Sequence, residues 1–264
     1  MKPFCLICMC LFAPFLIEAQ DESDAHLLSS CVSLEQQIFS ESSLEKKDSL
    51  LLAKAVVYKQ YQDFENALKT IDRISNLAGP DLSSRVMDEK IKLNYLMGNH
   101  KQVKNLIAET IFLEDYQKSK DIILFESLNY VALQELDQAR ESFETLVRDK
   151  EVITHAFRKV KFKNPEKAFI LSFIVPGSGQ IYAGRTFKGL LSLGVQAPLF
   201  YVGFSGISRG YVFTESIPSI ALFQGFYFGG AEYAKELAIE YNQATIEELS
   251  SSMISAIKKE ASLN

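Results

Sequence analysis

Two long, almost uncharged stretches near the C-terminus constrain this chain most. Residues 189–208 contain no charged side chain, and residues 210–231 contain only Glu215. A helix through the first stretch is about 30 Å long, which matches the hydrocarbon thickness of a bilayer. Because Arg209 alone separates the two stretches, they predict an α-helical transmembrane hairpin over residues 189–231. Lipid is therefore the predicted partner of this part of the chain.

Residues 156–188 are predicted to form a basic interfacial segment that a Pro-Gly break interrupts. The break is Pro176-Gly177-Ser178-Gly179, and its loosened backbone cannot face lipid uncovered. We therefore expect an interfacial or half-inserted helix over residues 164–175, then a tight turn. Gln180 and Tyr182 follow the break. They either line a small polar site or satisfy backbone groups freed by the break and mark the headgroup level.

A basic collar precedes the apolar stretches, although the chain as a whole has a formal net charge of -5. That modest negative charge argues against nucleic acid as a partner. The collar is predicted to bind anionic lipid headgroups, with Phe157, Val160 and Phe162 dipping into the membrane surface. Its predicted headgroup-binding residues are Arg158, Lys159, Lys161, Lys163 and Lys167.

The N-terminus has the pattern of a signal peptide. Lys2 precedes an apolar run over residues 3–17, and cleavage after Ala19 gives a signal peptide of residues 1–19. The alternative is an uncleaved anchor. Cleavage leaves Cys31 as the one cysteine of the mature chain, which excludes an internal disulfide or a thiolate metal cluster.

Export raises a question of orientation. It places residues 20–155 in the periplasm and the C-terminal hairpin in the inner membrane. The basic collar then lies outside, against the bias of basic residues toward the cytoplasm. Either the collar binds the outer membrane surface, or the N-terminal segment does not export the chain.

Residues 20–155 are predicted to be a domain of helical repeats, so the predicted fold class is all-α. Apolar residues recur at helical spacing, and similar six-residue segments begin at 62, 98 and 134. The helix over residues 24–39 is expected to cap the first repeat. The tail, residues 232–264, is predicted to be a helix that packs on the repeats.

This pattern resembles the tetratricopeptide repeat, a helix, a tight turn and a second helix. Gly98 matches the turn position, although Gln62 and Gln134 replace that glycine in the other copies. Phe64 matches the family's aromatic position, Ala67 and Ala139 match its small residue, and Val103 replaces that small residue in the middle copy. The predicted repeat-turn residues are Phe64, Ala67, Gly98, Val103, Leu136 and Ala139. The resemblance implies a concave groove that holds a peptide or partner helix; the alternative is an array that serves only as a spacer.

The break resembles the TM-two type of bacterial two-span hairpin domain. The residues that carry this resemblance are Pro176, Gly177, Gly179, Gln180, Tyr182, Gly184 and Arg185. It implies membrane association and no particular activity. Within the predicted hairpin, Gly189, Ser192, Gly225 and Gly229 either permit close helix contact or reflect the usual tolerance of membrane helices for glycine.

No catalytic or metal-binding pattern accompanies these features. The three histidines, His26, His100 and His155, lack metal-ligand spacing, and His100 is interpreted as a packing residue. The sequence therefore predicts a non-enzymatic protein without a cofactor, a membrane-anchored interaction module of the bacterial envelope. The alternative is a membrane-intrinsic homo-oligomer, or an accessory subunit in transport or envelope maintenance, with the repeats as a periplasmic cap.

Overall fold

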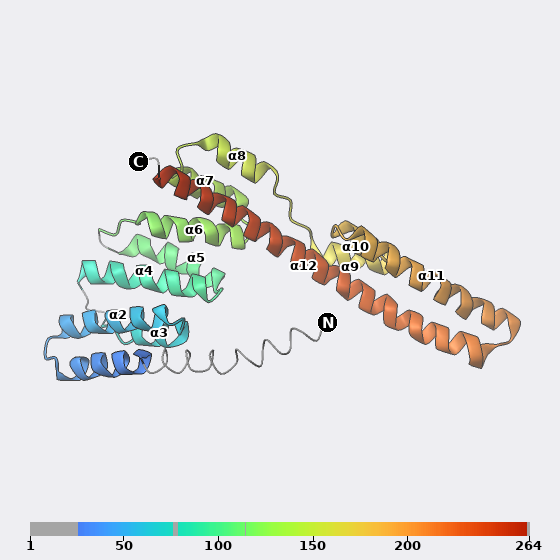
Figure 1. Ribbon diagram of the computed structural model, residues 1–264, viewed down its shortest axis with the longest axis horizontal. Helices are drawn as coiled ribbons and strands as arrows, with labels where there is room; N and C mark the ends of the chain where they lie inside the picture. The colour runs from blue at the N-terminus through green and yellow to red at the C-terminus, as the bar shows by residue number, and fades with distance from the viewer. Residues whose placement is uncertain (1–25, 76–78, 114, 263–264) are drawn as a thin grey trace, which may run out of the picture. The chain divides into compact units, whose positions relative to one another are not determined.

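The computed structural model describes residues 26–75, 79–113 and 115–262, and all regular structure in those ranges is helical (Figure 1). The predicted all-α class is confirmed for them. The predicted signal peptide lies outside the described residues. The chain forms two compact units, residues 1–133 and 134–264. This boundary differs from the predicted one at 155, because the helices after Gln134 pack with the C-terminal tail.

The first unit contains a helix over residues 26–40 followed by paired helices. In chain order these are α2 (Leu44–Gln60), α3 (Phe64–Ile71), α4 (Pro80–Leu96), α5 (His100–Glu109), the 3₁₀ turn η1 (Thr110–Phe112) and α6 (Lys120–Ala132). Local signals fix several starts. Pro80 occupies the first turn of α4, and the side chains of Asp63 and Ser119 accept backbone N–H groups at the starts of α3 and α6.

The helix ends recur at the spacing seen in the sequence. Gln62, Gly98 and Gln134 all have left-handed backbone conformation, with φ of 62°, 75° and 62°. The next helix begins two residues later each time. Asp63 N donates to Tyr58 O at 3.0 Å and Asn99 N to Asn94 O at 2.9 Å, which is the bonding of a Schellman turn. The two glutamines thus adopt the conformation for which the pattern favours glycine.

The predicted contact positions are among the most buried residues of their helices. Ala67, Val103 and Ala139 are each fully buried. Ala67 packs with Ala55, Ile71 and Leu93 in one cluster. Val103 packs in a second cluster, whose other buried members are Ile91, Leu106, Ile107 and Ile122. The periodic positions chosen from the sequence therefore lie in the core.

The second unit continues with seven helical segments. They are α7 (Leu136–Leu146), α8 (Lys150–Arg158), α9 (Pro165–Ile174), α10 (Ser178–Tyr182), α11 (Thr186–Arg209), a π-helical turn η2 (Val212–Ser216) and α12 (Ile217–Ala261). The helix predicted over residues 164–175 is present as α9. The short helix α10 is not predicted, because its first two residues, Ser178 and Gly179, belong to the glycine-rich break.

Helix α12 has 45 residues and runs without interruption through the predicted boundary at 231 (Figure 1). Beyond that point its buried face packs first on α9 and α10, where Ala234, Leu237 and Ala238 meet Ala168 and Ala183. At its far end the Glu260 carboxylate accepts the backbone N–H of Arg148, between α7 and α8. The tail is helical as predicted, and it packs on helices of its own unit.

Candidate membrane-interaction site

Among the described residues, α11 is the one helix long and apolar enough to cross a membrane. Only 17% of its most apolar window is buried, whereas the core helix of a water-soluble protein is mostly buried. Its exposed large apolar side chains are Phe187, Leu190, Leu191, Leu193, Val195, Phe200, Tyr201, Val202, Phe204 and Ile207. The apolar surface therefore extends along the helix and faces outward.

The second predicted span differs from the expectation. Gly210 ends α11 with φ of 81°, and the π-helical η2 then leads directly into α12, so the second helical stretch begins at Val212 instead of Gly210. The uncharged part of α12 is then residues 217–231, about 22 Å long. Arg209 and Glu215 form an ion pair of 2.7 Å across this turn. The stretch 210–231 is thus not one continuous apolar helix.

The Pro-Gly break is a close-packed corner. A Cβ on Gly177 would lie 2.1 Å from Gly189 O, and one on Gly179 would lie 1.9 Å from Ala168 O. Both distances are to backbone atoms, so no side-chain movement relieves them. Gly177 also has φ of 88°, which favours glycine. Gly177 and Gly179 are therefore required by the close approach of α9, α10 and α11.

Side-chain hydrogen bonds satisfy the buried polar groups at this corner. Ser172 Oγ donates to Gln180 Oε1 at 2.7 Å and accepts from Gly179 N at 3.0 Å. Gln180 Nε2 donates to Gly230 O of α12 at 2.8 Å, and Gln180 is 1% exposed. Both ends of the amide are therefore engaged, with Ser172 and with α12, whereas the freed N–H of Gly179 in the break is satisfied by Ser172. Ser172 was not singled out from the sequence, since its role depends on how α9 meets α10.

Tyr182, shortly before the start of α11, lies beside two residues of the basic collar, Lys163 and Lys167. The Tyr182 hydroxyl accepts the backbone N–H of Asn164 at 3.1 Å. The ammonium groups of Lys163 and Lys167 lie 5.0 and 5.4 Å from its ring centre. Asn242 bonds both the backbone N–H and the carbonyl of Lys163, at 2.7 and 2.8 Å. These two hydrogen bonds fix the backbone of Lys163 against α12, and the residue is half-buried.

The other predicted headgroup residues lie along the same connection. Arg158 ends α8, Lys159 caps it, and Lys161 follows; all three are exposed. Arg185 is exposed at the start of α11, directly after Gly184 in its left-handed turn. Phe157, which is expected to dip into the membrane surface, is half-buried, and its ring packs edge-on against Phe143 with centroids 6.1 Å apart.

The predicted small contact residues divide into two groups. Gly189 does permit close contact, since an added Cβ would lie 2.5 Å from Gly177 O. Gly225 and Gly229 do not, because an added Cβ at either position would meet nothing within 4 Å. Both instead line a hollow of about 500 Å³ between α11 and α12.

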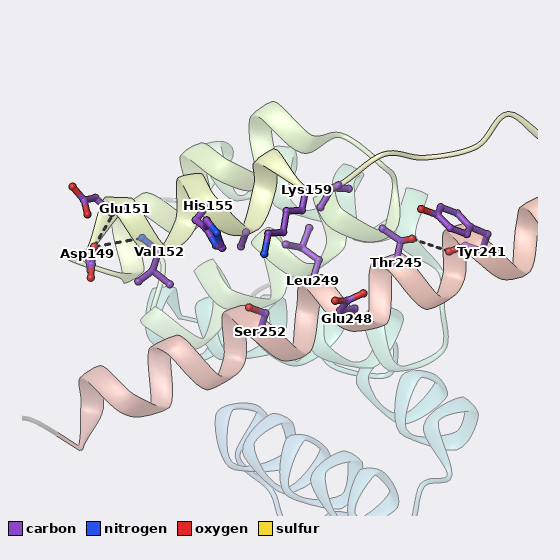
Figure 2. Close-up of a pocket in the computed structure, with 12 residues that line it drawn as sticks. Asp149, Glu151, Val152, His155, Lys159, Tyr241, Thr245, Glu248, Leu249 and Ser252 are labelled. Atoms are coloured by element: carbon purple, nitrogen blue, oxygen red, sulfur yellow. Dashed lines mark hydrogen bonds between the residues drawn. The ribbon is translucent and has the colours of Figure 1, made fainter. Parts of the chain in front are cut away.

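A second hollow, of about 670 Å³, lies between α8 and α12. Figure 2 shows His155 of α8 and Lys159, the residue that caps α8, facing Glu248 and Leu249 of α12 across it. Asp149 begins α8 by accepting the N–H groups of Glu151 and Val152. The lining mixes acidic, basic and apolar side chains. The sequence did not predict this hollow, because it exists only where the tail returns to α8.

Over the described ranges, no group of three or more His, Cys, Asp or Glu side chains is placed to hold a metal ion. His100 lies beside Tyr95, and its Nδ1 is 2.9 Å from Asn129 Oδ1. Comparison with protein-family models, with curated protein sequences and with solved structures gave no match in any of the three.

Proposed function

We infer that this chain is a membrane-anchored, non-enzymatic interaction module of the bacterial envelope. The anchor is α11 with the uncharged part of α12. The observation that carries this proposal is the outward apolar surface of α11 between Lys188 and Arg209. These two charges are separated by about 30 Å of helix, one hydrocarbon thickness.

Water is a poor solvent for this surface. Phe187, Tyr201 and Phe204 are each at least 70% exposed. A water-soluble monomer seldom exposes a contiguous apolar patch above a few hundred Å², whereas lipid covers such a surface at no cost. The polar backbone of the break is enclosed by protein, as lipid requires. The resemblance to TM-two hairpins agrees with this proposal.

The test of the anchor is extraction of the full-length protein from bacterial membranes with alkaline carbonate, followed by flotation. We expect the protein to stay with the membrane and to need detergent for solubility. Recovery as a soluble species without detergent contradicts the anchor.

The partner site we propose is the hollow between α8 and α12. It joins the last helix of the predicted repeat domain to the tail, and its mixed lining suits a peptide or a partner helix. The 36-residue recurrence of turns supports the tetratricopeptide-like interpretation of the preceding helices. In this proposal the repeats and the hollow face the periplasm at the inner membrane.

A photo-crosslinking amino acid at Val152 tests this site. Val152 lines the hollow and is 41% exposed, so the probe reaches a bound partner without disturbing the core. The control is the same probe at Phe39, which is 91% exposed on another helix. We expect a discrete adduct from position 152 alone. Adducts of equal yield from both positions, or from neither, contradict the proposed site.

The alternative function, a membrane-intrinsic oligomer, is favoured by one observation. Gly225 and Gly229 form the spacing of a helix-association motif and have nothing packed on them. Sedimentation of the full-length protein in detergent distinguishes the two functions. A monomer at all protein concentrations contradicts the oligomer.

A further inference from the structure

The hollow between α11 and α12 is an open apolar channel with one charged end. It holds about 500 Å³ and is lined by residues that include Lys188, Leu191, Ser192, Gly225, Phe226 and Gly229. The channel exists because Gly225 and Gly229 have no side chain and face open space. Along α11 it extends from Lys188 to Val195, about 10 Å.

The charged end of the channel lies where the anchor leaves the hydrocarbon. Lys188 is the one charged residue among the described residues that line it. Its Nζ donates a hydrogen bond to the Tyr233 hydroxyl and lies 4.9 Å from the centre of that ring. These contacts hold the ammonium at the channel mouth.

The positive charge at the mouth is not neutralised by a described carboxylate. Tyrosine is a neutral partner, and Lys188 forms no ion pair with the described residues. Glu166, on the neighbouring helix α9, is already paired with Lys235 at 2.6 Å. A ligand that brings a negative charge to Lys188 is therefore favoured.

Water and a second copy of the chain suit this channel less well. The lining beyond Lys188 and Tyr233 is mostly apolar, so water there lacks partners. A parallel two-fold contact through the channel would bring both copies of Lys188 to the same membrane depth, and like charges repel. The channel is also only about as long as a helix is wide, so it accommodates little of a second helix.

We propose that this channel binds one anionic phospholipid, with an acyl chain along Gly225 and Gly229 and the phosphate at Lys188. The proposal rests on the proposed function, because it requires α11 to lie in a bilayer. It deepens that function by naming a lipid class that the anchor selects.

Native mass spectrometry of the full-length protein, released from nanodiscs of phosphatidylglycerol and phosphatidylcholine, tests the proposal. We expect one phosphatidylglycerol to remain bound to the wild type. Gly229→Leu places a side chain in the channel from a position where an added Cβ meets nothing within 4 Å, and it should abolish retention. Lys188→Gln should lower the preference for phosphatidylglycerol about fivefold, while Lys188→Arg should keep it.

The matched control is Gly194→Leu, since Gly194 also faces open space on α11 but does not line the channel. It should retain lipid like the wild type. Equal retention by all variants overturns the proposal. A wild-type dimer that Gly229→Leu converts to monomer also overturns it and assigns the channel to a second copy. If carbonate extracts the protein, the anchor itself fails; if the protein is membrane-integral but retains no lipid, only this inference fails.

Discussion

At the scale of single residues, Gln62 and Gln134 have a backbone conformation that their side chains disfavour. Each has φ of 62°, where a Cβ is close to the following carbonyl. Gly98 holds the equivalent place in the middle copy without that cost. Substitution by glycine relieves the strain but also makes the unfolded chain more flexible, so the two effects partly cancel.

We expect Gln62→Gly to raise the free energy of unfolding by about 0.5–1 kcal/mol. Urea denaturation of the full-length protein, followed by circular dichroism, measures this change. The control is Gln60→Gly, two residues earlier at the exposed end of α2, which should lower stability by about 1 kcal/mol. If both substitutions change the free energy of unfolding in the same direction, the turn at residue 62 does not favour glycine.

A second residue-scale feature is the attachment of the helix at residues 26–40. Glu35 accepts hydrogen bonds from Arg73 at 2.7 Å and from Lys54 at 2.6 Å. The hydrogen bond from Arg73 is the largest cause, and the one from Lys54 the next, of the lowering of the pKa of Glu35 from 4.5 to about 2. The Glu35 side chain is 44% exposed, so solvent and salt weaken these pairs. Cys31, on the same helix, is buried.

Because the folded pKa of Glu35 lies below its unfolded value, its stabilisation is complete above pH 4.5 and disappears as the pH falls toward 2. We expect Cys31 to react faster with dithiodipyridine across that window, in a chain whose Cys5, Cys8 and Cys10 are replaced by Ser. In Glu35→Gln the reaction should already be fast at pH 4.5. The same pH profile in both proteins would exclude Glu35 as the group that holds the helix.

Sequence periodicity identified the buried contact positions but not the polar partners. Ala67, Val103 and Ala139 recur at one spacing, and that spacing determines which face of each second helix is buried. The hydrogen bond from Gln180 to Gly230 joins residues fifty positions apart, and no local pattern specifies which turn of α12 meets α10. For the same reason Ser172 and the two hollows were not predicted.

At the scale of elements, the corner made by α9, α10 and α11 depends on glycine. We expect Gly179→Ala to destabilise the protein by roughly 1–3 kcal/mol or more, because the new Cβ would overlap Ala168 O. Thermal unfolding in detergent measures the effect. Gly225→Ala is the matched control, since its Cβ meets nothing, and it should leave the melting temperature almost unchanged. Equal melting temperatures for the two variants would contradict the close packing.

The lengths of elements were predicted less well than their type. The Pro-Gly break and α9 follow from local backbone chemistry. The second apolar stretch was expected to begin at Gly210, but a left-handed glycine and a π-helical turn use its first residues. Likewise, the change from apolar to charged residues at 231 does not end α12. The helix continues because Leu237, Leu249 and Met253 give its later turns a buried face.

At the scale of the whole molecule, the charges define two levels on the proposed anchor. Lys188 and Tyr233 lie at one level, and Arg209 and Glu215 lie at the other. If α11 and α12 cross the bilayer, the tail after Glu232 and the residues before Lys163 are on the same side. The Arg209–Glu215 turn is then on the opposite side. Because these two side chains form an ion pair, moving their charges across the bilayer costs less free energy.

Cysteine labelling in spheroplasts tests this arrangement. In a chain without native cysteines, we expect a membrane-impermeant maleimide to label cysteines at Phe39 and Ser251, both exposed positions before and after the anchor. A cysteine at Ser208, beside the turn, should react only after lysis. The reverse pattern would keep the hairpin but place the helical repeats in the cytoplasm, in agreement with the positive charge of the collar. Labelling of all three positions in intact spheroplasts would mean that α11 does not cross the membrane, since a spanning helix separates its two ends by the full hydrocarbon thickness.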